Sequence, residues 1–442
     1  MLNRKIMTSL KAWKSDSKRK SLILSGARQV GKTYIIREFC RREYASFVEL
    51  NFLENEEFKL IFNGSLSADA ILTGIRLYIP DIEIIPGETV VFLDEIQECP
   101  EAVTALKFLT IDERVDVIAS GSALGISYKT RSSFPVGYVD FMDMYSLDFY
   151  EFIDAMNVGE DVIGVIRDCY ESKNKVPAAI HEKLNTYLRQ YLVVGGMPEV
   201  VDTFVATGDY KAVDTLQRQL YRSYLMDIAR YAPPEDRVKA EKCYTSIPMQ
   251  LNKENHKFQY SHVEKGGTAR KFGSSLDWLV GSNMVIPVMN VTKPEYPLKS
   301  FAIDDNLRMY PNDIGFLIGT YGFEIKQALL GDAGIEAASQ NIVLKTAKGG
   351  IYEALAAEML YKKGIEQLYF YRNESGTLEI EFFIENMDGV VPVEIKAGRS
   401  RTRSLNTILE SDDIRYGYKF ASQNVGVTGK KITLPLYMLP LI

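Results

Sequence analysis

Residues 26–33 combine two glycines, a lysine and a hydroxyl group in a spacing that can bind phosphate. They read Gly-Ala-Arg-Gln-Val-Gly-Lys-Thr and fit the pattern G-x-x-x-x-G-K-[ST]. Gly26 and Gly31 let backbone N–H groups turn inward around phosphate oxygens. Lys32 can then reach the β and γ phosphates, and the Thr33 hydroxyl can coordinate Mg²⁺. We therefore expect a site for ATP and Mg²⁺ that includes Gly26, Ala27, Arg28, Gln29, Val30, Gly31, Lys32, Thr33 and Tyr34.

The sequence on either side of this segment predicts a strand, a loop and a helix. Leu22–Leu24 form a short apolar run before it, and apolar residues recur at helical spacing from Ile35 to Cys40. A phosphate-binding loop needs this context, because the N-terminal end of the following helix adds partial positive charge to the phosphate site.

An acidic pair follows the next strong strand signal. The apolar run Val90–Leu93 predicts a buried parallel strand that presents Asp94 and Glu95 at its carboxyl end. We expect Asp94 to hold Mg²⁺, directly or through water, and Glu95 to orient or deprotonate the water that attacks the γ phosphate. A further predicted strand, residues 115–119, precedes Ser120-Gly121-Ser122, and Ser122 is the candidate sensor of the γ phosphate. Glu95, Lys32 and Ser122 are thus the expected catalytic residues.

Length and composition exclude several classes of protein. A chain of 442 residues is too long for a single core and predicts two to four domains. The net charge of −6 gives no chain-wide signature of nucleic-acid binding. The four cysteines and three histidines are scattered, without the spacing of a metal site. Because no apolar run is long enough to span a bilayer, we expect a cytoplasmic protein with no integral membrane segment.

The chain divides into four predicted regions of an α/β protein. Residues 1–150 alternate apolar runs with helical patterns, as in a parallel-sheet nucleotide-binding core. Residues 151–232 predict a helical lid, interrupted at Gly195-Gly196-Met197-Pro198. Residues 233–330 resemble a winged helix, which binds DNA or serves as a spacer; Arg270 and Lys271 are its candidate phosphate contacts. Residues 331–442 predict a C-terminal α/β domain.

The C-terminal region contains a predicted hairpin with a polar face. Residues 380–385 and 390–396 flank the turn Asn386-Met387-Asp388-Gly389. Alternation places on one face Glu379, Glu381, Glu394 and Lys396, with Glu381 opposite either Lys396 or Glu394. This face is either an ordinary solvated surface or a site where Lys396 or a divalent metal separates the carboxylates. The basic cluster beyond it suits a phosphate backbone or a solubilising loop, and consists of Arg399, Arg401 and Arg403.

Together these motifs resemble a widespread bacterial and archaeal family of AAA-type P-loop ATPases with a C-terminal domain of unknown function. That domain is similar to restriction-endonuclease-like folds. The resemblance rests on blocks along nearly the whole chain: GARQVGKTYIIREF, VVFLDEIQECPEAVTALKF, ASGSALG, FPVGYVDF, GGMPEVV, LRMYPNDIG, KGGIYEALAAEML, LEIEFFIE and VPVEIKAG.

The resemblance implies a nuclease-type core in the C-terminal domain. Its members would be a helix glutamate, Glu353, together with Glu381 and the E-x-K pair Glu394 and Lys396. In such cores the carboxylates hold Mg²⁺ and the lysine activates water. Two departures are visible: relatives usually have Asp at position 381, and commonly Lys or Arg where this chain has Tyr138. Arg131 is a candidate substitute for that basic residue.

Three functional hypotheses follow from the sequence. In the first, ATP binding and slow hydrolysis switch the state of the C-terminal nuclease-like domain. In the second, the protein is a metal-dependent DNA nuclease gated by ATP. In the third, it is an adaptor or DNA-binding protein whose nuclease-like fold has lost its chemistry. Whether the protein binds DNA or another protein stays open, and the sequence does not determine the oligomeric state.

Overall fold

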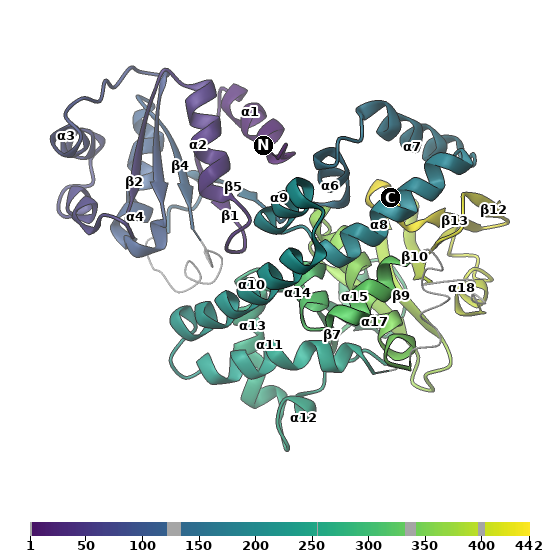
Figure 1. Cartoon of the computed structure of the whole chain (residues 1–442). Coiled ribbons are helices and arrows are strands. Elements are labelled where there is room, and N and C mark those ends of the chain that lie inside the picture. The colour runs from purple at the N-terminus through teal and green to yellow at the C-terminus, as the bar shows by residue number, and fades with distance from the viewer. Residues whose placement is uncertain (1, 122–133, 254, 332–341, 397–402) are drawn as a thin grey trace. The chain divides into compact units, whose positions relative to one another are not determined.

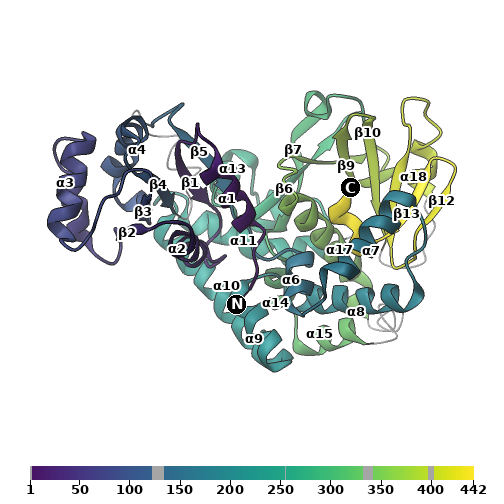
Figure 2. The same cartoon turned by 90° about the horizontal axis from the view of Figure 1, so that it is seen from above.

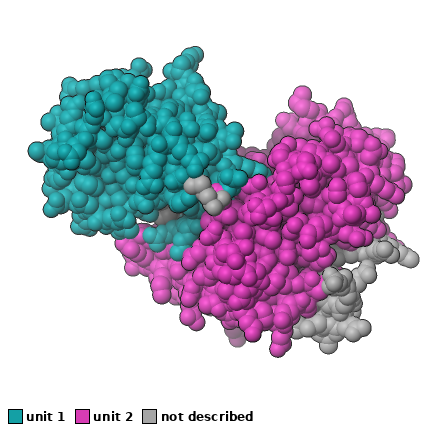
Figure 3. Space-filling model, turned by 45° about the horizontal axis from the view of Figure 1, so that its top comes forward, with its two compact units in different colours: residues 1, 3–146, 281–283 teal, residues 2, 147–280, 284–442 magenta. Residues whose placement is uncertain are grey.

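The computed structural model describes residues 2–121, 134–253, 255–331, 342–396 and 403–442. The chain divides into two units (Figure 3). Unit 1 contains residues 3–146 with 281–283, and unit 2 contains residue 2 with 147–280 and 284–442. Among the residues that the structure describes, no helix is both long enough and apolar enough to cross a membrane.

Unit 1 is built on a five-stranded sheet in the order β2-β3-β4-β1-β5 (Figure 1). All neighbouring strands pair in parallel. The strands are β1 (Ser21–Ser25), β2 (Ser46–Asn51), β3 (Thr89–Asp94), β4 (Asp116–Ser120) and β5 (Val139–Asp143). The helices are α1 (Ile6–Ser15), α2 (Lys32–Glu43), α3 (Ala68–Tyr78) and α4 (Pro100–Asp112). The predicted parallel α/β sheet in the first 150 residues is therefore confirmed.

Apolar side chains on both faces of this sheet are buried, as a parallel sheet requires. Val91 and Leu93 on β3 pack in one cluster with residues of α3 and α4. Val90 and Phe92 alternate with them along the strand, point to the opposite face and are equally buried. Because both faces are covered, only the ends of the strands can present polar groups to a ligand.

The first part of unit 2 is helical, as predicted for residues 151–232. The predicted interruption is also confirmed, because α8 ends at Val194 and α9 begins at Pro198. The helices up to residue 281 are α6 (Phe149–Ala155), α7 (Glu160–Ser172), α8 (Ala178–Val194), α9 (Pro198–Thr207), α10 (Tyr210–Tyr231), α11 (Arg237–Leu251), α12 (Tyr260–Val263) and α13 (Ala269–Gly281).

The rest of unit 2 surrounds an eight-stranded mixed sheet in the order β12-β13-β11-β10-β9-β8-β6-β7 (Figure 2). The strands are β6 (Val285–Val291), β7 (Ala302–Pro311), β8 (Leu368–Arg372), β9 (Glu379–Asn386), β10 (Gly389–Ile395), β11 (Gly417–Ala421), β12 (Gly426–Thr428) and β13 (Lys431–Pro435). The helices here are α14 (Ile314–Gly319), α15 (Phe323–Leu330), α17 (Ile342–Lys362) and α18 (Arg403–Ile408). Because β6 pairs with β8, the sheet crosses the domain boundary expected at residue 330.

The predicted hairpin is formed by β9 and β10. Gly389 pairs with Asn386 and Val393 with Phe382, so the turn closes with Met387 and Asp388. Extending this register by one residue places Glu394 opposite Glu381. Of the two alternatives left open for the polar face, an ordinary solvated surface is excluded, since Glu381 is 7% and Glu394 1% exposed. Helix α17 packs against β10, a non-local contact that strand alternation does not reveal.

Candidate functional site

The loop between β1 and α2 needs both of its predicted glycines. Gly26 has φ +151°, and a Cβ atom there would lie 2.1 Å from the carbonyl oxygen of Met144. Gly31 precedes α2 in the left-handed conformation, with φ 96°. A side chain at either position would therefore force the loop out of its present path.

Lys32 lies at the start of α2 with its ammonium group directed at its own loop. Its Nζ donates hydrogen bonds to the carbonyl oxygens of Gly26 at 2.9 Å and Ala27 at 2.8 Å. Burial lowers the pKa of Lys32 to about 8, although the nearby carboxylates of Glu95 and Asp94 raise it. A phosphate would offer this cation charged acceptors, which form stronger hydrogen bonds than carbonyl groups do.

Asp94 ends β3 beside the hydroxyl of Thr33, as the motif spacing predicts. The Thr33 Oγ1 lies 3.2 and 3.1 Å from the two carboxylate oxygens of Asp94. Burial raises the pKa of Asp94, while its hydrogen bonds from Ser120 and Thr33 lower it. A hydroxyl and a carboxylate are the hard oxygen ligands that Mg²⁺ prefers, so these two residues fit the ion.

Two further residues, which sequence reasoning missed, hold the Asp94 carboxylate. Asn51 Nδ2 donates to it at 3.1 Å, and the Ser120 hydroxyl donates to its other oxygen. Asn51 pairs with Asp94 across β2 and β3. A polar residue at the end of a neighbouring strand was therefore the feature of the sequence that could have identified Asn51. The predicted sensor, Ser122, lies outside the described residues, as does Arg131.

Glu95 directly follows β3 in the left-handed conformation, with φ 54°. Its side chain is partly exposed, and Gln97 Nε2 donates a hydrogen bond to it. The charge of Glu95 opposes the effect of burial on the pKa of Lys32. Tyr34, in the first turn of α2, is 53% exposed. A charged base, a cation and two metal-ligand candidates thus share one edge of the sheet.

Two basic residues of unit 1 make contacts that the sequence did not predict, Arg4 at the phosphate-binding loop and Lys107 at the amino end of β5. Arg4 donates to the carbonyl oxygens of Val30 at 3.0 Å and Tyr145 at 2.6 Å, which ties the phosphate-binding loop to the segment after β5. Arg4 is far from Tyr145 in the sequence, so no local pattern could have predicted this contact. Lys107 Nζ lies 5.1 Å from the ring centroid of Tyr138, the residue that replaces a basic side chain of the resembled family.

The C-terminal hairpin brings together three of the four residues predicted for a second site. Lys396 Nζ lies 2.9 Å from Glu381 Oε1 and 3.3 Å from Glu394 Oε1. Burial raises the pKa of Glu381 and of Glu394, and Lys396 opposes both shifts. The second carboxylate oxygen of Glu394 is buried without a hydrogen-bond partner.

Glu353 is hydrogen-bonded to other side chains, although its charge still raises the pKa of Glu381. Its carboxylate accepts hydrogen bonds from Arg308 NH1 and the Tyr310 hydroxyl, both at 3.0 Å, and lies 2.9 Å from His256 Nδ1. Burial acts to raise the pKa of Glu353, but His256 and Arg308 hold it well below its ordinary value. Among the described residues, no group of three or more His, Cys, Asp or Glu side chains is arranged to hold a metal ion.

The motifs around Gly195 and Asp313, which suggested no chemistry, meet inside unit 2. Gly196 N donates to one Asp313 carboxylate oxygen at 2.9 Å, and Gly315 N to the other at 2.8 Å. A Cβ atom on Gly196 would lie 2.0 Å from the carbonyl oxygen of Leu147. These glycines are therefore required because two chain segments pass in direct contact.

Around this contact lies a buried ionic cluster, which we call the Leu147 anchor. It comprises Tyr191, Asp313, Glu358 and Lys362, and it holds Leu147, where the chain passes from unit 1 to unit 2. Lys362 Nζ lies 2.5 Å from Glu358 and 3.5 Å from Asp313. Lys362 and the Tyr191 hydroxyl donate to the carbonyl oxygen of Leu147 at 2.9 and 2.8 Å.

Comparisons with protein families identify one domain of known type. Residues 18–153 match a family described as an AAA domain, so unit 1 carries an AAA-type ATPase domain. Residues 185–325 match a domain of unknown function (DUF8612), and residues 348–437 match another (DUF4143). A comparison with curated proteins gives no match.

Three solved structures are distant likenesses of this chain. The chain is similar to a Walker-type ATPase of Pyrococcus abyssi, with 14% identity, a TM-score of 0.42 and coverage of 72% of this chain and 95% of that chain. The Aeropyrum pernix Orc1 protein in complex with DNA has 11% identity, a TM-score of 0.28 and coverage of 73% and 92%. The Drosophila ORC bound to DNA has 14% identity, a TM-score of 0.26 and coverage of 72% and 92%. Likenesses with such low TM-scores do not bear on function.

Proposed function

We propose that unit 1 binds ATP with Mg²⁺ and hydrolyses it slowly, and that its nucleotide state controls unit 2. The observation that carries this proposal is the convergence of Lys32, Thr33 and Asp94 at one edge of a parallel sheet. The match of residues 18–153 to an AAA domain supports it.

Each residue has a distinct part in ATP binding. The N–H groups of the loop from Gly26 to Gly31 surround the phosphates, and Lys32 exchanges its two carbonyl contacts for phosphate oxygens. Thr33 and Asp94 would hold Mg²⁺, which when bound offsets the charge of the β and γ phosphates. Asn51 and Ser120 keep the Asp94 carboxylate in place.

Glu95 accepts the proton of the attacking water in this proposal. Its partly exposed carboxylate is free to approach water, whereas that of Asp94 is 2% exposed and fully hydrogen-bonded. Tyr138 replaces a basic residue of the resembled family, so if that residue stabilises the transition state there, the positive charge has to come from elsewhere in this protein or from a partner. We therefore expect slow turnover, or turnover that depends on a partner.

Control of unit 2 would begin where the chain leaves unit 1. Met144 N donates to Ser25 O at 2.8 Å, and the Met144 carbonyl lies against Gly26, so this residue follows the position of the phosphate-binding loop. Leu147, three residues later, is held by the Leu147 anchor. Hydrogen exchange of the amide of Leu147, which donates to Gly196 O at 2.7 Å, should differ between the ATP and ADP states. Equal exchange in both states would contradict control by this route.

A second candidate function is metal-dependent cleavage of DNA by unit 2. The buried, unpartnered Glu394 oxygen beside Glu381 and Lys396 favours it, because such an oxygen suits a cation. Engagement of Glu353 by Arg308 weakens it. Plasmid cleavage with Mg²⁺ or Mn²⁺ should stop in Lys396→Ala and persist in Lys299→Ala, an exposed control. Cleavage that survives Lys396→Ala would rule out this site.

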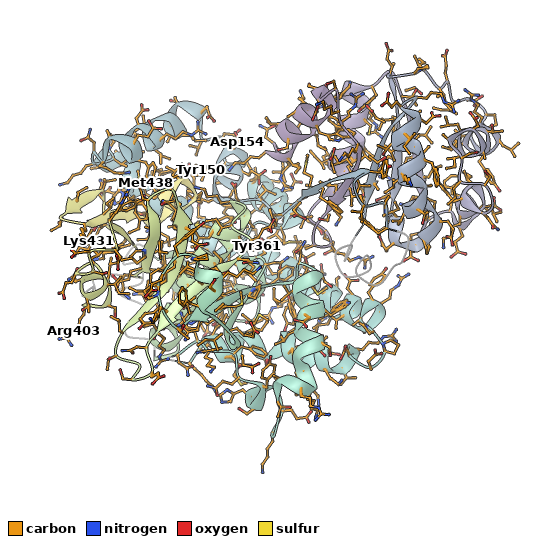
Figure 4. All side chains as sticks on the ribbon, turned by 180° about the vertical axis from the view of Figure 1, so that it is seen from behind. Tyr150, Asp154, Tyr361, Arg403, Lys431 and Met438 are labelled. Atoms are coloured by element: carbon orange, nitrogen blue, oxygen red, sulfur yellow. The ribbon has the colours of Figure 1, made fainter. Side chains whose placement is uncertain are left out.

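The adaptor hypothesis rests on basic residues outside these sites. Arg403 projects from the surface of unit 2 (Figure 4), whereas Arg399 and Arg401 lie outside the described residues. On α13, Arg270 is exposed, but Lys271 pairs with Glu264. The order of α11, α12 and α13 before the β6–β7 pair supports the winged-helix proposal. Salt-sensitive DNA binding without cleavage, weakened by neutralising Arg403, would favour this function.

A further inference from the structure

A cavity lies in unit 2, apart from the ATP site of unit 1 and from the Glu381, Glu394 and Lys396 side chains of the hairpin. Its volume is about 640 Å³, within the roughly 300–1,000 Å³ of pockets that enclose small ligands. It opens where β6 and β8 end, between the segment before α12 and the turn that joins β8 to β9. These two strands are parallel neighbours, and ligands of open α/β sheets bind beyond the carboxyl ends of such strands.

At this cavity the side chain of Asn290, near the end of β6, is hydrogen-bonded to the backbone at the end of β8. Its side-chain amide accepts a hydrogen bond from Arg372 N at 3.0 Å and donates one to Arg372 O at 3.4 Å. Asn290 is 4% exposed, so this contact is sheltered from water. The backbone of Arg372 is thereby fixed at the wall of the cavity.

The two cations of the cavity are weakly paired. Arg372 Nε lies 3.5 Å from Glu379, which also pairs with the fully buried Arg308, itself bound by Glu353. Lys257 also lines the cavity, and its ammonium group forms no ion pair with a described residue. The acidic residue of the lining, Glu374, lies in the exposed turn. An anionic group on a ligand would give Lys257 an ionic partner and Arg372 a closer one.

The remaining polar lining is rich in amides. Asn255, Asn306 and Asn373 face the cavity together with Asn290. Asn306 makes no side-chain hydrogen bond to a described residue, and it lies in an irregular stretch of β7, where Ile303 and Leu307 pair with consecutive residues of β6. A carboxamide donates and accepts hydrogen bonds side by side, as the edge of a nucleobase does. Asn290 and Asn373 already bond within the protein, but a simple inorganic anion would leave the Asn306 amide and the Asn255 Nδ2 donor unused.

We propose that this cavity binds a nucleoside monophosphate, either free or as the phosphorylated end of a nucleic-acid strand. Lys257 and Arg372 take the phosphate, and the amides of Asn255 and Asn306 take the base or ribose. Asn290 is a positioning residue, since it acts through Arg372. This inference does not depend on ATP hydrolysis or on cleavage by the C-terminal hairpin.

Titration calorimetry on the full chain tests the proposal, in a Lys32→Ala background that removes the principal phosphate contact of the ATP site. The probes are the four common nucleoside 5′-monophosphates, the matching nucleosides and a 5′-phosphorylated trinucleotide. Nucleotides should bind at least about tenfold more tightly than nucleosides, because a charge-assisted hydrogen bond is worth that much. Lys257→Ala should weaken binding about tenfold or more on the same grounds, whereas Lys265→Ala, an exposed control, should not.

The 5′-phosphorylated trinucleotide distinguishes a free nucleotide from the end of a nucleic-acid strand. Tighter binding of the trinucleotide than of the mononucleotides assigns the site to a strand end, and equal or weaker binding assigns it to free nucleotides. The proposal is overturned if no probe binds at millimolar concentration, if nucleosides bind as well as nucleotides, or if Lys257→Ala leaves the affinity unchanged. Lys257 has no ion pair with a described residue to lose, so its variant should fold normally.

Discussion

Replacing Lys362 by methionine should destabilise unit 2 by removing a charge and its hydrogen bonds, not by changing the packing. The Lys362 side chain is 2% exposed and lies beside two fully buried carboxylates, Glu358 and Asp313. Methionine retains most of the apolar stem, so the packing changes little. Removing one partner of a buried ion pair costs about 3–5 kcal/mol, because the remaining charge is left uncompensated. We expect a loss of this size in the free energy of unfolding near pH 8.5.

The loss should depend on pH in a definite direction. Burial and the repulsion of Asp313 raise the pKa of Glu358 to about 7, with Lys362 opposing them, so the variant should have a higher value still. A carboxyl group whose folded pKa exceeds its unfolded pKa contributes stability at low pH, which is lost as pH rises through the folded value. Protonation of Glu358 in the folded variant should therefore make the loss smaller at pH 6 than at pH 8.5.

Urea unfolding monitored by tryptophan fluorescence measures this loss. In a Trp13→Phe background Trp278, which lies in unit 2, is the one remaining tryptophan of the chain. Lys363→Met is the matched control, because the next lysine is exposed and should change stability by no more than about 0.5 kcal/mol. The double variant Glu358→Gln, Lys362→Met should recover part of the loss, because it removes the charge left unpaired.

Two results would refute this reasoning. One is a Lys362→Met loss no greater than that of Lys363→Met at pH 8.5. The other is a loss that shrinks as pH rises, since Glu358 would then not be the group that takes up the proton.

Two other changes test the ATP site. Gly26→Ala should abolish ATP binding, because its Cβ would meet Met144 O at 2.1 Å; calorimetry should show normal binding in Gly64→Ala, which has a similar positive φ but no neighbour within 4 Å. Ser120→Ala removes a hydrogen bond that lowers the pKa of Asp94, so the pH below which Mg²⁺-dependent ATP binding is lost should move upward. A pH profile identical to that of the wild type would show that Ser120 does not tune Asp94.

Local sequence was sufficient to predict the elements that depend on residues next to one another in the chain. The phosphate-binding loop depends on the spacing of Gly26, Gly31 and Lys32, and Asp94 follows a continuous apolar strand. The hairpin of β9 and β10 was also predictable, because alternation and a short turn fix its register. In each case one segment contains the whole signal.

Features that depend on distant segments were not predictable in this way. Asn51 reaches Asp94 only because β2 lies next to β3, and the order of strands in a sheet cannot be predicted from the sequence of either strand. The burial of Glu381 depends on neighbours from outside the hairpin, and the engagement of Glu353 depends on Arg308, 45 residues away. The contact of Ser120 with Asp94 was missed because the predicted strand ended at residue 119, and the exact end of a strand is poorly defined by its sequence.

The most direct test of the central proposal compares ATP binding and phosphate release in Glu95→Gln with those of the wild type. With Mg²⁺ present, the variant should bind ATP normally and release phosphate about 10²–10⁴ times more slowly, because it lacks the general base. Glu98→Gln, three residues along and partly exposed, should behave as the wild type does, and Lys32→Ala should lose both binding and release. Equal phosphate release by the wild type and Glu95→Gln, or no ATP binding by the wild type, would contradict the account.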